Sequence, residues 1–229
     1  MTLNEILFDD RSVQPFCIRF KRELTEILVL LSNTEKAYEK SFSDLPEDRP
    51  KWVQEFTFMS IESTISATRL LIEGHVNASG NTMRIAYESL CMAILLTSQN
   101  PVVIAKGKKA RPLDFAKAFE QKHGQTKPYL AVDHVISNAQ EVGLTDGSIW
   151  LKEAKSFYNA YSHSTLISMN SLMLTGGKAI IGGGYFPEKD EVYSNSLRFI
   201  TRLLRMYPKI IETIGQRNLT NCLRGIRNA

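Results

Sequence analysis

The sequence predicts an all-α protein, a single antiparallel bundle of six or seven helices over residues 1–229. Apolar residues recur every three or four positions through most of the chain, as in amphipathic helices. Glycine and proline cluster between these periodic segments and mark their ends. One short Gly-rich segment, residues 175–187, interrupts the pattern and is expected to be a hairpin or loop and the only β-like part of the fold.

The first three helices are predicted over residues 15–42, 51–73 and 81–98. Pro46 and Pro50 separate the first from the second, because proline cannot continue a helix. Gly74 and Gly80 punctuate the entry to the third helix, and Asn100-Pro101 stops it. The short connection predicts that the second and third helices form an antiparallel pair.

The second half of the chain begins with a basic loop around Lys106-Gly107-Lys108-Lys109. Pro112 in a first helical turn predicts a short helix that ends near His123, and another follows from 128 to 142. The spacing then predicts two long helices, over 148–174 and 188–214. Residues 215–229 are either a short terminal helix or a disordered tail.

Several classes of protein are excluded by composition. The N-terminus lacks the basic and apolar regions of a signal peptide, and no apolar run is long enough to span a membrane. We therefore expect a cytoplasmic protein with no membrane partner. Neither the histidines nor the three cysteines show metal-ligand or disulfide spacing, so no metal and no cofactor is predicted; the cysteines are Cys17, Cys91 and Cys222.

Positive charge is concentrated in two places. Residues 105–127 hold seven Lys and Arg against two acids, and residues 198–229 hold seven against one. On the last long helix, four cations lie within about 60° of one another at 100° per residue; they are Arg198, Arg202, Arg205 and Lys209. Such a stripe either is a solvated face or binds a polyanion, and we expect a nucleic acid or an acidic protein as partner.

A polar cluster interrupts the apolar face of the predicted helix 148–174. Asn159 and His163 are four residues apart and would share one helical face, with Ser162 beside them. His163 is either a hydrogen-bonded packing residue or a general acid or base, polarised by Asn159 or by a carboxylate such as Glu88. Asn159 and His163 are thus the candidate catalytic residues.

Arg84 and Glu88 are the second candidate feature. They are four residues apart on the predicted third helix, which is otherwise apolar. Such a pair is either a weak surface bridge or a buried constellation that needs further partners. Arg69 and Glu73 repeat the spacing one helix earlier.

An all-α bundle with a late Asn-x3-His element resembles the HEPN superfamily (higher eukaryotes and prokaryotes nucleotide-binding). Many of its members are ribonucleases with an Arg and a His in the motif, often with Asn after the Arg. Asn159 and His163 match, whereas Tyr158 stands where the family's Arg would be. The Arg-x3-Glu of Arg84 and Glu88 also resembles uncharacterised bacterial helical-bundle proteins grouped near this superfamily.

The resemblance implies a protein that binds RNA or another nucleic acid, with weak or lost ribonuclease activity. Its pocket would combine Tyr158, Asn159, Ser162 and His163 with the Arg84/Glu88 pair. Any enzymatic activity would be that of a ribonuclease-like hydrolase or transferase. The alternative is a non-enzymatic bundle that binds a protein or a small ligand, and a homodimer is a further expectation.

Overall fold

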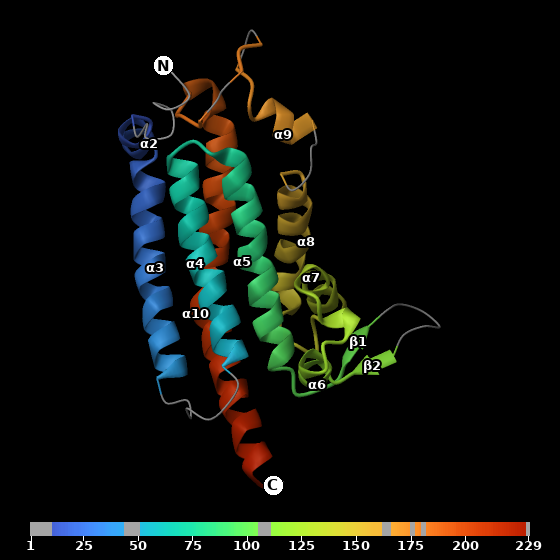
Figure 1. Ribbon diagram of the computed structural model, residues 1–229. Helices are drawn as coiled ribbons and strands as arrows, with labels where there is room; N and C mark the ends of the chain where they lie inside the picture. The colour runs from blue at the N-terminus through green and yellow to red at the C-terminus, as the bar shows by residue number, and fades with distance from the viewer. Residues whose placement is uncertain are drawn as a thin grey trace.

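The computed structural model describes residues 11–43, 51–104, 111–161, 166–174, 177–179 and 182–227. Its main body is a bundle of long helices along a common axis (Figure 1), which confirms the predicted all-α class. Helix α3 packs on α10, and α4 packs antiparallel on α5. The four helices are α3 (Lys21–Phe42), α4 (Trp52–Ile72), α5 (Val76–Leu96) and α10 (Asp190–Arg227).

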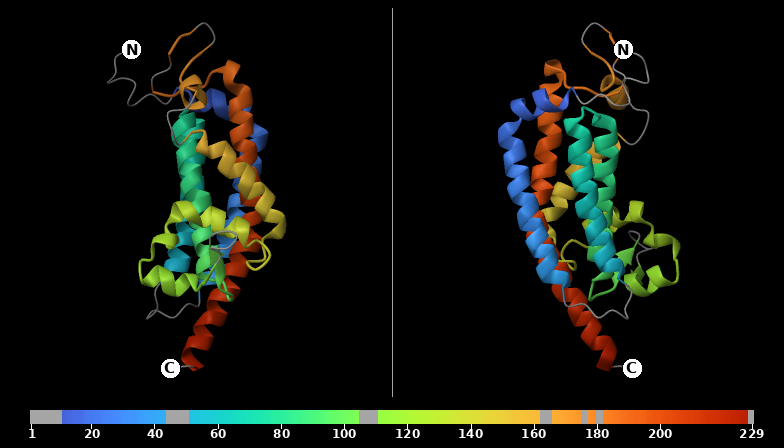
Figure 2. Two further views of the ribbon diagram at one scale, coloured as in Figure 1. Left: turned by 90° about the vertical axis from the view of Figure 1, so that its right-hand side faces the viewer. Right: turned by 60° about the vertical axis from the view of Figure 1, so that its left-hand side comes forward.

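Smaller elements cover one side and one end of this bundle (Figures 1 and 2). Beside α5 lie α6 (Phe115–Glu120), the 3-10 turn η2 (Gly124–Thr126), α7 (Pro128–Ser137) and α8 (Thr145–Asn159). The end of the bundle where α10 begins carries α2 (Val13–Arg19), α9 (Leu166–Asn170) and the 3-10 turn η3 (Pro187–Lys189).

Helix α5 forms the centre of the core. Every side chain from Ser89 to Thr97 is buried, and this stretch contains no charged residue. A helix that is apolar on all sides must be covered on all sides. Helices α4, α7, α8 and α10 all contact α5 and provide that cover.

One polar network crosses this core. The phenolic oxygen of Tyr207 on α10 lies 2.7 Å from the hydroxyl oxygens of Ser60 and Thr64 on α4. Ser60 also donates a hydrogen bond of 2.6 Å to the carbonyl oxygen of Ala86 on α5. Burial raises the pKa of Tyr207 to about 12. The network therefore joins three helices through neutral hydroxyl groups.

The expectation that residues 175–187 are the only β-like segment was wrong. A two-stranded antiparallel sheet pairs β1 (Val102–Ile104) with β2 (Arg111–Leu113), around the predicted basic loop. The run Val102-Val103-Ile104 is rich in β-branched residues, which favour strands.

Pro112 lies in strand β2 and not in the predicted first turn of a helix. Proline is accommodated there because β2 is an edge strand. Helix α6 begins only after Asp114, whose side chain accepts a hydrogen bond from the Lys117 backbone N–H. In the Gly-rich segment, the described residues form one isolated bridge, Met173 to Ala179.

Nine α-helices occur in the described residues, against the six or seven predicted. The predicted helix 15–42 is divided at Phe20 into α2 and α3, and the predicted helix 148–174 is divided into α8 and α9. Helix α5 begins at Val76, so Gly80 lies inside it and not before it.

The last helix is much longer than predicted, because α10 continues past residue 214 to Arg227. Gly215 does not stop it. A Cβ atom at this position would lie 2.6 Å from the Cβ of Ser41, so glycine permits the close crossing of α10 and α3.

His134 on α7 makes the stability of the fold dependent on pH. Its buried ring places Nε2 3.0 Å from the carbonyl oxygen of Gln125, and burial lowers the pKa of the imidazole. Below about pH 6.5, the imidazole of His134 therefore binds a proton more readily in the unfolded chain than in the native state. Acidification consequently destabilises the fold. We expect the stability advantage of the wild type over His134→Gln to shrink between pH 7.5 and pH 5, as measured by urea unfolding. Parallel pH profiles for the two proteins would contradict this.

Candidate functional site

The polar segment around Asn159 lies at the end of α8. The helix stops at Asn159, and the next backbone N–H groups bond only three residues back, Ala160 to Phe157 and Tyr161 to Tyr158. The predicted continuous helix 148–174 was thus wrong. An asparagine such as Asn159 favours a helix end over a helix interior, because its side chain can compete with the backbone for hydrogen bonds.

Asn159 is half-buried at this helix end. Ser162 and His163 lie outside the described residues, so their predicted roles remain predictions. Helix α8 ends at Asn159, and Ala160 and Tyr161 after it form a turn.

Tyr158 is a core residue. Its side chain is 1% exposed, and its ring lies 5.9 Å from that of Tyr87 on α5 and 5.7 Å from that of Phe199 on α10. Burial raises the pKa of the Tyr158 phenol well above its ordinary value. The side chain at this position is therefore a neutral contact between helices, where an Arg would carry a charge.

Arg84 and Glu88 form a partly buried ion pair on α5. The Nε of Arg84 lies 2.6 Å from Oε1 of Glu88, and the two side chains are 28% and 14% exposed. Their environment is thus intermediate between the two predicted alternatives. The hydrogen bond to Glu88 raises the pKa of Arg84, which keeps the guanidinium charged. Arg69 and Glu73 form the more exposed version of the same pair.

Three of the four cations of the predicted stripe line one groove between α3 and α10. We call this the arginine groove; it encloses about 280 Å³. Helix α3 adds a fourth arginine, Arg22, opposite those of α10. The groove is lined by Arg22, Glu23 and Glu26 of α3 and by Ser194, Leu197, Arg198, Thr201, Arg202 and Arg205 of α10.

The four arginines of the groove differ in their partners. Arg205 donates to Glu26 through Nε at 3.0 Å, and Arg202 donates to Glu153 of α8 at 2.7 Å. Arg22 and Arg198 are exposed and form no ion pair with another described residue. The acids thus hold two guanidinium groups in place, while the other two have no such partner among the described residues.

Sequence reasoning missed Arg22, because no local pattern relates it to residues about 180 positions later. Only the packing of α3 on α10 brings it to the stripe. Lys209, the fourth predicted cation, lines a different cavity farther along α10. In the other basic segment, Lys106, Lys108 and Lys109 lie outside the described residues.

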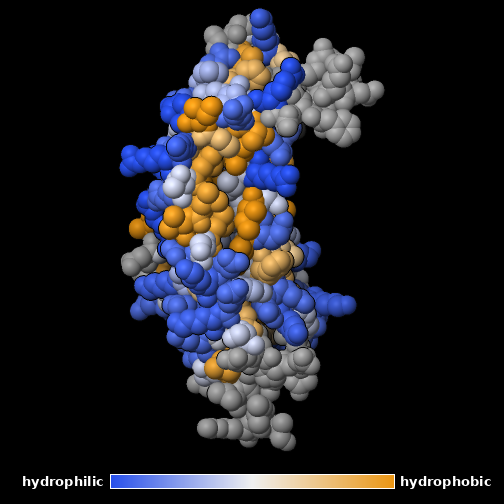
Figure 3. Space-filling model, turned by 90° about the vertical axis from the view of Figure 1, so that its left-hand side faces the viewer, coloured by the Kyte–Doolittle hydropathy of each residue, from blue (hydrophilic) through white to orange (hydrophobic). Residues whose placement is uncertain are grey.

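An apolar surface follows α3 and α4 (Figure 3). Leu28 is 67% exposed, Phe58 57% and Ile65 48%. Contiguous exposed apolar surface is typical of binding faces. It is consistent with the alternative of a protein-interaction bundle, which stays a prediction.

Among the described residues, no group of three or more His, Cys, Asp or Glu side chains could hold a metal ion. None of the described helices combines the length and the apolar character that crossing a bilayer requires. Comparison of the chain with protein-family models, with curated proteins and with solved structures found no match.

Proposed function

We propose that this protein binds RNA through the arginine groove, without cleaving it. The observation that carries the proposal is the convergence of four arginines from α3 and α10 on one groove. The guanidinium group is planar and presents paired N–H donors that match the oxygens of a phosphate. A backbone phosphate of RNA is therefore the ligand that this arrangement suits.

The contacts within the groove support a division of roles. Glu26 and Glu153 hold the guanidinium groups of Arg205 and Arg202 in place. Their negative charges also lower the net positive charge of the groove. Arg22 and Arg198 are exposed on opposite helices and supply the direct contacts to phosphate. Two such contacts give modest affinity that depends on salt, because each releases counterions from the RNA.

Binding without cleavage is proposed because of Tyr158. The resemblance to the HEPN superfamily places a cationic Arg at this position, whereas the phenol here is buried against Tyr87 and stays neutral. A neutral group in the core cannot stabilise the charge that develops on a phosphate during cleavage.

The salt dependence of RNA binding tests the proposal. With a fluorescein-labelled oligouridylate of 20 nucleotides, we expect affinity to fall steeply with salt in an anisotropy titration. Arg22→Ala and Arg198→Ala should each reduce the slope of log K against log salt by about 0.7, the value for one lost contact to a single strand.

Arg69→Ala is the matched control, because Arg69 is an exposed arginine on α4 outside the groove. It should leave the slope unchanged. The absence of binding at low salt, or equal slopes for all three variants and the wild type, would overturn the proposal.

A further inference from the structure

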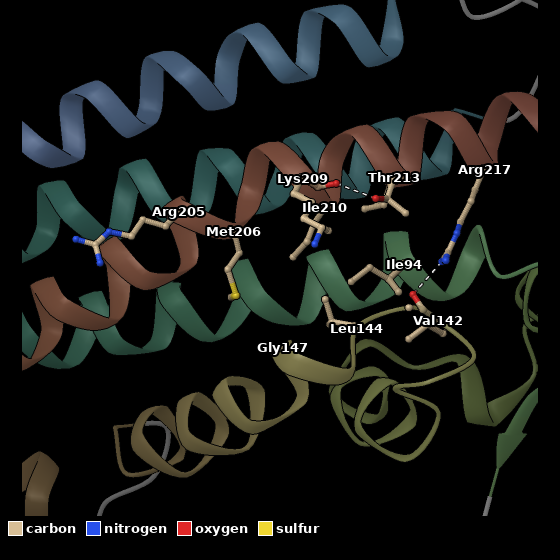
Figure 4. A pocket seen from close by; sticks show the side chains of 12 residues that line it. Ile94, Val142, Leu144, Gly147, Arg205, Met206, Lys209, Ile210, Thr213 and Arg217 are labelled. Atoms are coloured by element: carbon tan, nitrogen blue, oxygen red, sulfur yellow. Dashed lines mark hydrogen bonds between the residues drawn. The ribbon is translucent and has the colours of Figure 1, made fainter.

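A second cavity, of about 400 Å³, lies where α10 passes α5 and the connection between α7 and α8 (Figure 4). Its walls are mainly apolar and come from three parts of the chain that are distant in sequence. The apolar side chains are those of Ile94, Val142, Leu144, Met206, Ile210 and Ile214.

Two cations of α10 stand at the rim of this cavity. Figure 4 shows Lys209 and Arg217 extending from α10 toward the connection that carries Val142 and Leu144. Lys209 is exposed and forms no ion pair with another described residue. Arg205 also borders the cavity, but Glu26 binds its guanidinium group and Figure 4 shows it pointing away.

Arg217 is fixed in its place by the backbone around it. Its Nη1 donates a hydrogen bond of 2.9 Å to the carbonyl oxygen of Val142. Gly143 has a φ of +67°, and a Cβ atom there would lie 2.9 Å from Nη2 of Arg217. Glycine at position 143 thus permits both the turn and the close approach of the guanidinium group.

Among the side chains that the structure describes, no acidic one lines the cavity. The positive charge of Lys209 and Arg217 therefore has no counterpart among these lining side chains. A cavity with apolar walls, a few convergent polar groups and this volume has the properties of small-molecule sites.

We propose that this cavity binds a small amphipathic anion, a carboxylate or phosphate group on an apolar body. The anionic group would accept hydrogen bonds from Lys209 and Arg217, and the apolar body would lie against Met206, Ile210 and Leu144. This inference does not depend on RNA binding, since the direct contacts of the arginine groove are made by Arg22 and Arg198.

Titration calorimetry with three probes tests the proposal. Decanoate and decyl phosphate carry the two anionic groups on the same chain, and decanol carries neither. We expect one or both anions to bind at least about tenfold more tightly than decanol, since hydrogen bonds between charged groups are the stronger ones. Which anion binds more tightly identifies the head group.

Lys209→Met keeps the length of the side chain and removes its charge, and it should weaken binding of the anion about tenfold. Thr213→Trp should fill the cavity and prevent binding. Lys36→Met, at an exposed position on α3, is the control and should have no effect. RNA binding by Lys209→Met should equal that of the wild type, so failure of one proposal is distinguishable from failure of the other.

Three results would overturn this inference. They are the absence of binding by both anions, equal binding of decanol and the anions, and undiminished binding by Lys209→Met. The side chain of Lys209 is exposed and forms no ion pair with another described residue, so its substitution is not expected to prevent folding.

Discussion

Gly74→Ala is expected to lower the free energy of unfolding by at least about 3 kcal/mol. Gly74 follows α4 with a φ of +82°, and a Cβ atom there would lie 2.2 Å from the carbonyl oxygen of Gly184 and 2.3 Å from its nitrogen. Both obstacles are backbone atoms, so no side-chain rotation relieves the overlap. The two segments must therefore move apart.

The contacts around Gly184 explain why this movement is costly. Its N–H donates to the carbonyl oxygen of Glu73 at 3.0 Å, and its own carbonyl accepts a hydrogen bond of 2.9 Å from Tyr193. Tyr193 in turn packs against Phe16 and Phe20, with ring centroids 5.3 and 6.1 Å apart. Displacing Gly184 thus loosens the attachment of α2 to the start of α10.

Gly177→Ala provides the matched control for Gly74→Ala. Gly177 has a similar φ of +78°, but a Cβ atom there would meet nothing within 4 Å. Its substitution should cost only the left-handed backbone strain, about 1 kcal/mol. Urea unfolding of both variants measures the difference. Equal losses in the free energy of unfolding for the two variants would show that the close approach of Gly74 to Gly184 does not add to the cost of the substitution.

Tyr207→Phe is expected to destabilise the protein by about 1–3 kcal/mol, because it removes the oxygen that joins the core network. Ser60 and Thr64 are fully buried, so water does not replace the lost partner. In thermal unfolding, each kcal/mol corresponds to a decrease in Tm of about 2–4 °C for a chain of this size.

Two further variants distinguish the effect of breaking the network from the effect of removing any tyrosine hydroxyl group. Tyr129→Phe removes the hydroxyl of a tyrosine that is 51% exposed on α7, and it should leave stability nearly unchanged. The triple variant Tyr207→Phe, Ser60→Ala, Thr64→Val should lose less than the sum of its single changes, since no partner is left unsatisfied. Additive losses would contradict a coupled network.

Local sequence patterns alone determine much of the helical structure. The predicted helix 51–73 is observed as Trp52–Ile72, because its apolar spacing and its flanking Pro50 and Gly74 act within a few residues. The buried middle of α5 follows in the same way from a run without charge. The cationic stripe of α10 required only the helical repeat, and it contributes three arginines to the groove.

Tertiary structure decided where glycine ends a helix and where it permits a crossing. Gly80 and Gly215 resemble stop signals in the sequence, yet both lie inside helices. In the folded chain, Tyr161 packs directly against Gly80, and Ser41 packs directly against Gly215. A periodic pattern of apolar residues describes a single helix, so it does not indicate which residue of another segment packs against a given glycine.

The candidate sites show the same division. The sequence determined that Arg198, Arg202 and Arg205 share a helical face, since the repeat of one helix suffices for this. Arg22 joins these arginines only because α3 packs on α10. The acids that hold Arg202 and Arg205 come from α8 and α3, respectively. Likewise, Arg217 lines the cavity at Lys209 because α10 continues past Gly215 and places Arg217 against Val142. Residues that are distant in the chain meet through the burial of apolar faces, which is a property of the whole fold.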